Sequence, residues 1–124
     1  MKQINIGVIG TGWCGGIRTE TARNNPLVKD IHISETNEIR LKEMADKIGA
    51  KTATTDYKEL LKIDDIDAII ISATPETTHF PMARDALIAG KHVFLEKPIA
   101  IALEEADELI ALAKQKKLKF TIGY

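Results

Sequence analysis

The chain has 124 residues, with 17 basic and 18 acidic side chains and a formal net charge of −1. Apolar residues make up 44% and charged residues 28%, values typical of a globular domain. This balance argues against nucleic acid or an anionic membrane as the partner, because either would require a basic patch. With Cys14 as its one cysteine, the chain has no internal disulfide and no cysteine cluster for zinc, so we predict no metal site.

The first residues lack the charged and then apolar pattern of a signal peptide, and no apolar run approaches the length of a membrane span. We therefore expect a cytoplasmic setting. The length corresponds to one domain, residues 1–124.

The N-terminal half begins with a short apolar strand at residues 3–9, followed by a glycine-rich loop. A helix is predicted at about residues 13–24 and ends at the Asn25-Pro26 turn. Residues 31–35 form the second strand, and residues 41–48 the second helix, with apolar side chains on one face. A weak strand at 51–54 comes next. The capping-box spacing of Asp56 and Glu59 then begins a short helix.

The second half begins at residues 67–72, where the apolar side chains show no alternation, as in a strand covered on both faces. A helix at 77–89 with Phe80, Ala83 and Leu87 facing inward, a strand at 92–95, a helix at 103–113 and a strand at 120–122 follow. Strands joined by such helices must be parallel, with right-handed crossovers. We predict an α/β fold, a doubly wound parallel sheet in three α/β/α layers.

Gly10, Gly12 and Gly15 fit the G-x-G-x-x-G pattern between a strand and a helix of a βαβ unit. In such a loop Gly10 turns the chain sharply, Gly12 lets a pyrophosphate approach the backbone, and Gly15 allows close packing of the helix on the sheet. The backbone N–H groups around Trp13 and Cys14 would then point at the anion. A tight turn that binds no ligand is the alternative interpretation.

Glu35 ends the second strand, twenty positions after Gly15. An acidic side chain there can accept hydrogen bonds from both adenosine ribose hydroxyls and would repel a 2′-phosphate. NAD is therefore favoured, although Arg40 leaves NADP open, and Glu35 could instead be an exposed strand-end carboxylate. Trp13 would either cover the cofactor or cap the sheet edge, and Cys14 would contribute packing and its backbone N–H.

Two further stretches lie at strand ends: ATPETTHF at residues 73–80 follows one strand, and HVFLEKPI at residues 92–99 runs through the carboxyl end of the next. A doubly wound sheet places its ligands at these ends. With these stretches the whole chain resembles the Gfo/Idh/MocA oxidoreductases, which include glucose–fructose oxidoreductase and inositol dehydrogenase. The motifs that carry this resemblance are Gly10-x-Gly12-x-x-Gly15, Glu35, Thr74-Pro75-x-x-x-His79, Ala89-Gly90-Lys91-His92-Val93 and Glu96-Lys97-Pro98.

The resemblance implies a dinucleotide-binding Rossmann domain of an oxidoreductase that transfers hydride between a nicotinamide cofactor, NAD or NADP, and a sugar or polyol. Lys97 would be the catalytic residue, because an ammonium beside the substrate hydroxyl stabilises alkoxide charge and can relay the proton. A surface lysine paired with Glu96 and a locally packed His79 are the alternatives. The predicted cofactor-binding residues are Gly10, Thr11, Gly12, Trp13, Cys14, Gly15, Glu35, Ser72, Thr74, Pro75, His79, Glu96 and Lys97.

This sequence departs from the family pattern at two positions. Glu76 stands where Asn is common, which puts its cofactor contact in doubt, and Arg18 stands where His is frequent, without an assigned role. His32 and His92 lie on predicted strands and are expected to be structural.

Members of this family carry a further α+β domain that supplies most substrate contacts, a catalytic histidine and the oligomer interface. The chain ends where the sixth strand ends, so we expect it to bind NAD(H), to be inactive alone, and to form homo-oligomers through an exposed surface. A stand-alone NAD(H)-binding or redox-sensing module is the alternative. A fold that binds S-adenosylmethionine is a weaker one, because it does not account for Glu96-Lys97-Pro98.

Overall fold

The computed structural model describes residues 2–123, except for the side chains of Trp13 and Cys14. The strands are β1 (Ile4–Ile9), β2 (Val28–Ser34), β3 (Thr52–Thr54), β4 (Ala68–Ile71), β5 (His92–Glu96) and β6 (Phe120–Gly123). The helices are α1 (Trp13–Arg23), α2 (Glu38–Ile48), α3 (Tyr57–Leu61), α4 (His79–Ile88) and α5 (Leu103–Gln115), and a 3-10 helix, η1 (Glu76–Thr78), precedes α4.

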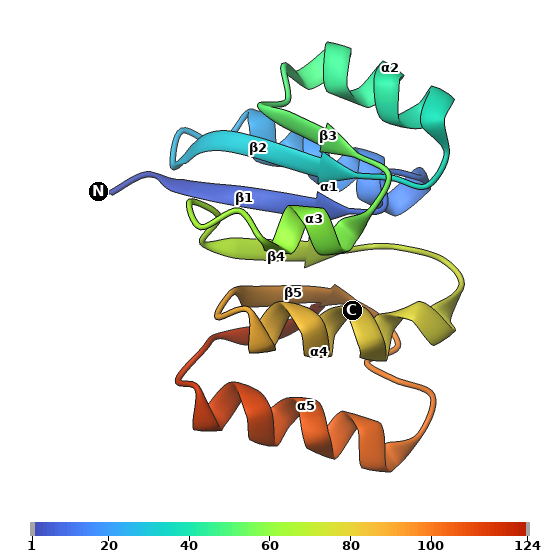
Figure 1. Cartoon of the computed structure of the whole chain (residues 1–124), viewed down its shortest axis with the longest axis vertical. Helices are drawn as coiled ribbons and strands as arrows, with labels where there is room; N and C mark the ends of the chain where they lie inside the picture. The colour runs from blue at the N-terminus through green and yellow to red at the C-terminus, as the bar shows by residue number, and fades with distance from the viewer. Residues whose placement is uncertain (1, 124) are drawn as a thin grey trace.

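The strands form one parallel sheet in the order β3-β2-β1-β4-β5-β6. Figure 1 shows that the arrowheads all point the same way, so every carboxyl end lies along one edge of the sheet. The chain moves outward from β1 to β2 and β3, then crosses back to β4 on the other side of β1. This order confirms the predicted doubly wound fold, whose topological switch point lies between β1 and β4.

Two apolar clusters form the core, one on each face of the sheet. Side chains of α1 and α2 pack on Ile6, Val8, Ile31 and Ile33 on one face. Side chains of α3, α4 and α5 pack on the other face, with Ile69, Ile71, Val93 and Leu95 among the strand residues that they cover. In Figure 1, α1 lies behind the sheet and α3 and α4 lie in front of it. The three-layer prediction is therefore confirmed.

The boundaries of β2 and of the fourth helical region differ from the prediction. β2 begins at Val28 rather than Ile31. A register shift between Ile4 and Ile6 interrupts its pairing with β1 and places polar residues inside the strand, so the apolar pattern did not reveal where the strand begins. The helix predicted from residue 77 starts as η1 and becomes α-helical at His79.

The predicted capping box at α3 does not close. Asp56 Oδ1 accepts a hydrogen bond from the backbone N–H of Lys58 at 2.9 Å, which caps the helix. The Glu59 carboxylate accepts from Lys62 Nζ at 3.0 Å and does not return to the N-cap backbone. Asp56 therefore caps α3 without the reciprocal contact from Glu59 that completes a capping box.

The loops after β1 and β4 touch at the switch point. Gly10 has φ = +90°, and a Cβ atom on it would lie 2.7 Å from the Ala73 backbone. A Cβ on Gly15 would lie 1.9 Å from the carbonyl oxygen of Gly10. Glycine is therefore required at both positions, by the left-handed turn in one case and by close packing in both.

Candidate functional site

A cleft of about 630 Å³ opens at the carboxyl ends of the strands. It is lined by the segments that follow β1, β2, β3, β4 and β5, so residues far apart in sequence meet there. Crevices at the switch point of doubly wound sheets are their usual ligand sites. Of the predicted site residues, the cleft brings together Gly10, Gly12, Glu35, Ser72, Thr74, His79, Glu96 and Lys97.

The remaining predicted residues do not line the cleft or cannot be placed in it. Thr11 is buried and contacts Glu35, and Gly15 packs against Gly10. The side chains of Trp13 and Cys14, for which a cofactor contact was predicted, lie outside the described residues. Pro75, which follows the lining residue Thr74, is not among the residues that line the cleft.

Gly12 is the N-cap residue of α1 and leaves space in front of its backbone. Among the described side chains, a Cβ atom on Gly12 would meet only the Arg40 Nη1 atom within 4 Å, at 3.3 Å. Among the described residues no side chain caps this helix terminus, and no acidic side chain lies in its first turn. Backbone N–H groups at such a terminus, with the helix dipole, favour a bound anion.

Glu35 is 7% exposed and ties the end of β2 to the glycine loop. Its Oε1 accepts hydrogen bonds from the Thr11 backbone N–H at 2.8 Å and the Thr11 hydroxyl at 3.1 Å. Its Oε2 accepts from the backbone N–H of Asn37 at 2.9 Å. Burial alone would raise the pKa of this carboxyl, but these hydrogen bonds and the Arg40 charge outweigh burial and lower the pKa, so Glu35 is ionised at neutral pH.

Arg40 lies over the same part of the cleft. Its Nη1 is 3.6 Å from Glu35 Oε1, and its side chain is half exposed. A guanidinium here stands close to both Glu35 and Gly12, where it can reach a phosphate or an adenine ring. The geometry therefore keeps both NAD and NADP open as ligands.

Ser72 directly follows β4 and lines the cleft. Its side chain is buried, and its Oγ has no hydrogen-bond partner within the described part of the chain. A buried hydroxyl without a partner is uncommon in a folded domain, and its position in the cleft suits a hydrogen bond to a ligand.

Glu96 and Lys97, at the end of β5, differ in how they are held. Glu96 Oε2 accepts from Arg18 Nε at 3.1 Å and forms a second, close contact with Arg18 Nη2. The Arg18 guanidinium also stacks over the Phe94 ring, 4.7 Å from its centroid. Lys97 is exposed, and no salt bridge from it occurs among the described residues, so the predicted alternative of a Lys97–Glu96 pair is wrong.

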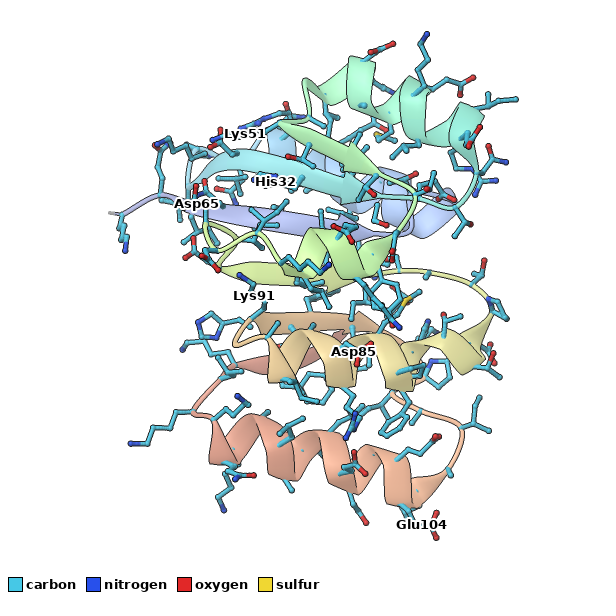
Figure 2. All side chains as sticks on the ribbon, viewed as in Figure 1. His32, Lys51, Asp65, Asp85, Lys91 and Glu104 are labelled. Atoms are coloured by element: carbon cyan, nitrogen blue, oxygen red, sulfur yellow. The ribbon has the colours of Figure 1, made fainter. Side chains whose placement is uncertain are left out.

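Several residues of the cleft were missed in the sequence, among them three that lie outside its predicted motifs. Thr55, Tyr57 and Met82 line the cleft from the β3–α3 segment and from α4. The Tyr57 hydroxyl donates to Asp85 Oδ2 at 2.6 Å, and Asp85 is labelled on α4 in Figure 2. Burial and this carboxylate raise the pKa of Tyr57. Tyr57 follows the carboxyl end of β3, and that position is the signal that could have identified it.

Two kinds of feature are absent from the described residues. No group of three or more His, Cys, Asp or Glu side chains is arranged to hold a metal ion there. No helix in that part of the chain has the length and apolar character needed to cross a membrane.

Comparison with known proteins agrees with the fold. Residues 4–124 match the GFO_IDH_MocA family, described as an oxidoreductase family with an NAD-binding Rossmann fold. The myo-inositol 2-dehydrogenase of Thermotoga maritima is 33% identical over 124 residues, which cover 98% of this chain and 36% of that protein.

Solved structures of related enzymes superpose closely on the chain. The scyllo-inositol dehydrogenase of Lactobacillus casei, with bound NAD(H) and scyllo-inositol, has a TM-score of 0.90 at 30% identity, covering 98% of this chain and 36% of that one. A mutant of KijD10, a 3-ketoreductase of Actinomadura kijaniata in complex with NADP, has a TM-score of 0.89 at 29% identity, covering 99% of this chain and 39% of that one. The chain thus corresponds to little more than a third of each relative. It belongs to the GFO_IDH_MocA oxidoreductases, and it corresponds to their NAD-binding Rossmann domain.

Proposed function

We propose that this chain is the cofactor domain, residues 1–124, of an oxidoreductase that transfers hydride between NAD(H) and a hydroxyl or carbonyl group of a sugar or polyol. The observation that carries the proposal is the continuity of one cleft from Gly12 and Glu35 to Lys97. A dinucleotide needs a ribose acceptor at its adenosine end and an anion site for its central pyrophosphate. Oxidation of a hydroxyl also needs a proton-transferring group at the nicotinamide end. The bound NAD(H) and scyllo-inositol of the Lactobacillus casei relative support this assignment.

The residues present fit NAD. The open space at Gly12 admits a pyrophosphate to the backbone, and the N-terminus of α1 favours its charge. Glu35 Oε2 accepts from the Asn37 backbone N–H and, over a long 3.5 Å contact, from the Thr36 hydroxyl, and an adenosine ribose hydroxyl can replace Thr36 there. The Ser72 hydroxyl, which has no partner among the described residues, can bind the cofactor elsewhere in the cleft. NAD, when bound, supplies the carbon that accepts or donates the hydride.

Lys97 is the proposed catalytic residue. Its ammonium has no internal partner among the described residues, so it is available to a substrate hydroxyl at the mouth of the cleft. There it stabilises the negative charge that develops on oxygen when a hydroxyl is oxidised, and it takes part in relaying the proton. His79 and Glu96 line the cleft near Lys97 and complete the proposed nicotinamide end of the site.

The chain spans 36% of the length of the Thermotoga relative, so we propose that it binds cofactor without turning substrate over by itself. We also propose a cytoplasmic setting, because a single cysteine suits a reducing compartment. Self-association is supported by the apolar side chains of Leu103 and Ile101, which are 75% and 62% exposed.

Calorimetric titration with NADH, NADPH and S-adenosylmethionine tests the proposal. We expect NADH to bind, NADPH to bind more weakly, and S-adenosylmethionine not to bind. Gly12→Val should abolish NADH binding while the circular dichroism spectrum stays unchanged, because its side chain would extend into open space over the anion site. A folded chain that binds neither nicotinamide cofactor contradicts the proposal. NADH oxidation by the chain alone with sugar substrates would contradict its inactivity.

A further inference from the structure

We propose that His79 is a positioning residue, whose ring ties the Lys97–Pro98 segment to the end of β4 and so fixes Lys97 beside the cofactor. This inference rests on the proposed function for the role of Lys97. It differs from the sequence prediction for His79, in which the residue contacts the cofactor directly.

The His79 ring bridges two loops that follow neighbouring strands. The side chain is 2% exposed, at the first residue of α4. Its Nδ1 lies 2.7 Å from the carbonyl oxygen of Pro98, in the segment after β5. Its Nε2 lies 3.0 Å from the carbonyl oxygen of Ala73, in the segment after β4. Both ring nitrogens are therefore occupied by the chain's own backbone.

The chemistry of these contacts requires the ring to donate. A carbonyl oxygen only accepts hydrogen bonds, so each contact needs an N–H on the imidazole. A neutral ring donates to one carbonyl at a time, and an imidazolium donates to both. In neither form does a ring nitrogen remain free for a ligand. The ring lines the cleft with its carbon atoms, while its two nitrogens contact backbone carbonyl oxygens.

The contact between His79 and Pro98 affects Lys97 because Lys97 and Pro98 are adjacent in the chain. The bound carbonyl belongs to the residue directly after Lys97, and the residue directly before it, Glu96, is held by Arg18. Lys97 thus lies between two anchored neighbours, while its own ammonium stays unpaired among the described residues. The backbone of a residue that transfers protons must be held in place, because small displacements of the reacting group lower the rate by large factors. Its titratable group must at the same time be unpaired, so that it can bind the substrate.

Two amide substitutions separate the two hydrogen bonds. In His79→Asn the side-chain N–H₂ takes the place of Nδ1 and can still donate to Pro98. In His79→Gln it takes the place of Nε2 and can donate only to Ala73. If the hydrogen bond to Pro98 positions Lys97, the Asn variant keeps Lys97 beside the cofactor and the Gln variant does not. A residue with a merely structural role would not separate the two variants in this way.

The readout is the rate at which each lysine is acetylated by an N-hydroxysuccinimide ester, quantified by mass spectrometry with and without NADH. NADH is set to ten times the dissociation constant of each variant, so that occupancy is equal. In the parent chain NADH should slow acetylation of Lys97 about tenfold. The Asn variant should keep this protection, and the Gln variant should fall below about threefold. Lys116, exposed at the end of α5, is the internal control. His92→Gln, at the amino end of β5, is the matched control variant. In this variant NADH should protect Lys97 from acetylation as it does in the parent chain.

The outcomes distinguish this inference from the proposed function. Equal Lys97 protection in both His79 variants overturns the positioning role and leaves the proposed function intact. NADH binding without protection of Lys97 in the parent chain overturns the inference and the role of Lys97, but leaves the cofactor site. No NADH binding overturns both. Equal loss of protection in both variants, together with a lower melting temperature, would make the role of His79 structural only.

Discussion

At the scale of single residues, Glu35 holds the glycine loop, and we propose that the same carboxylate also binds the cofactor. Two backbone N–H groups and the Thr11 hydroxyl already bind it, so it orders the glycine loop before any ligand arrives. A carboxylate offers about four acceptor positions. The fourth is used by a long contact from the Thr36 hydroxyl at 3.5 Å, which a ribose hydroxyl can replace. Arg40, 3.6 Å away, gives the same corner of the cleft a positive group that could favour an added phosphate.

Replacing Glu35 by Ala should therefore weaken the two cofactors unequally. Loss of the loop tie affects NADH and NADPH alike, whereas loss of the ribose acceptor affects mainly NADH, and Arg40 is released to bind the 2′-phosphate. We expect NADH binding to weaken by at least about tenfold, or about 1.4 kcal/mol, and NADPH binding to weaken less. Parallel titrations of both cofactors provide the measurement. Equal weakening would assign Glu35 to the loop alone.

At the scale of elements, each end of the sheet has its own polar contacts. At the carboxyl ends, Arg18 joins α1 to β5 through Glu96. At the amino ends, the buried Lys91 Nζ donates to the carbonyl oxygens of Ile63 and Ile66, both at 2.8 Å, which fastens the α3–β4 connection to the start of β5. Figure 2 shows Lys91 and Asp65 at the amino-terminal side of the sheet, away from the cleft. Within the Ala-Gly-Lys-His-Val motif, Lys91 thus has a structural role.

Lys91→Met tests this role. Methionine keeps most of the side-chain volume but leaves two carbonyl oxygens without their donor, so the free energy of unfolding should fall by about 1–3 kcal/mol. Urea denaturation followed by circular dichroism measures the loss. The affinity of the folded chain for NADH should not change, because the contacts lie at the opposite end of the sheet. Lys116→Met, at an exposed position, is the control, and an equally small effect in both variants would contradict the assignment.

At the scale of the whole molecule, the dependence of stability on pH reflects the buried interior. His32 on β2 is 2% exposed, and neither ring nitrogen has a partner within the described part of the chain. Burial lowers the pKa of His32 below its ordinary value of 6.5, an effect that the nearby Asp30 only partly opposes. The folded protein therefore holds this ring neutral at pH values where the unfolded chain binds a proton.

Stability should consequently decrease as the pH falls below about 6.5, because the unfolded state then binds more protons than the folded state. One such group contributes a slope of up to about 1.4 kcal/mol per pH unit. His32→Leu removes this group. Between pH 7.5 and pH 5.5 the free energy of unfolding should therefore change less in the variant than in the parent chain, by roughly the contribution of one bound proton. Urea denaturation of both proteins at the two pH values measures the difference. Identical pH dependence in the two proteins would exclude His32 as the source.

The order of elements, the doubly wound topology, the glycine loop and Glu35 followed from local patterns. The resemblance to the family added five further residues of the proposed cofactor cleft, Ser72, Thr74, His79, Glu96 and Lys97. Glycine spacing after a strand identified the anion loop, and an acid at the next strand end identified Glu35. The start of β2 was missed because a register shift breaks its alternation. Tyr57 was missed because its apolar neighbours explained it as part of a helix, although it also lines the cleft.

The sequence by itself determined which elements form and which residues end the strands, because both depend on spacing along a few neighbouring residues. Only the tertiary structure decided which side chains meet. Arg18 and Glu96 are 78 residues apart, and His79 and Pro98 are 19 apart. Such contacts arise when parallel strands bring their carboxyl ends to one edge, and no periodicity within either segment encodes the partner. The same packing holds Glu96 and Pro98 on either side of Lys97, whose ammonium has no partner among the described residues.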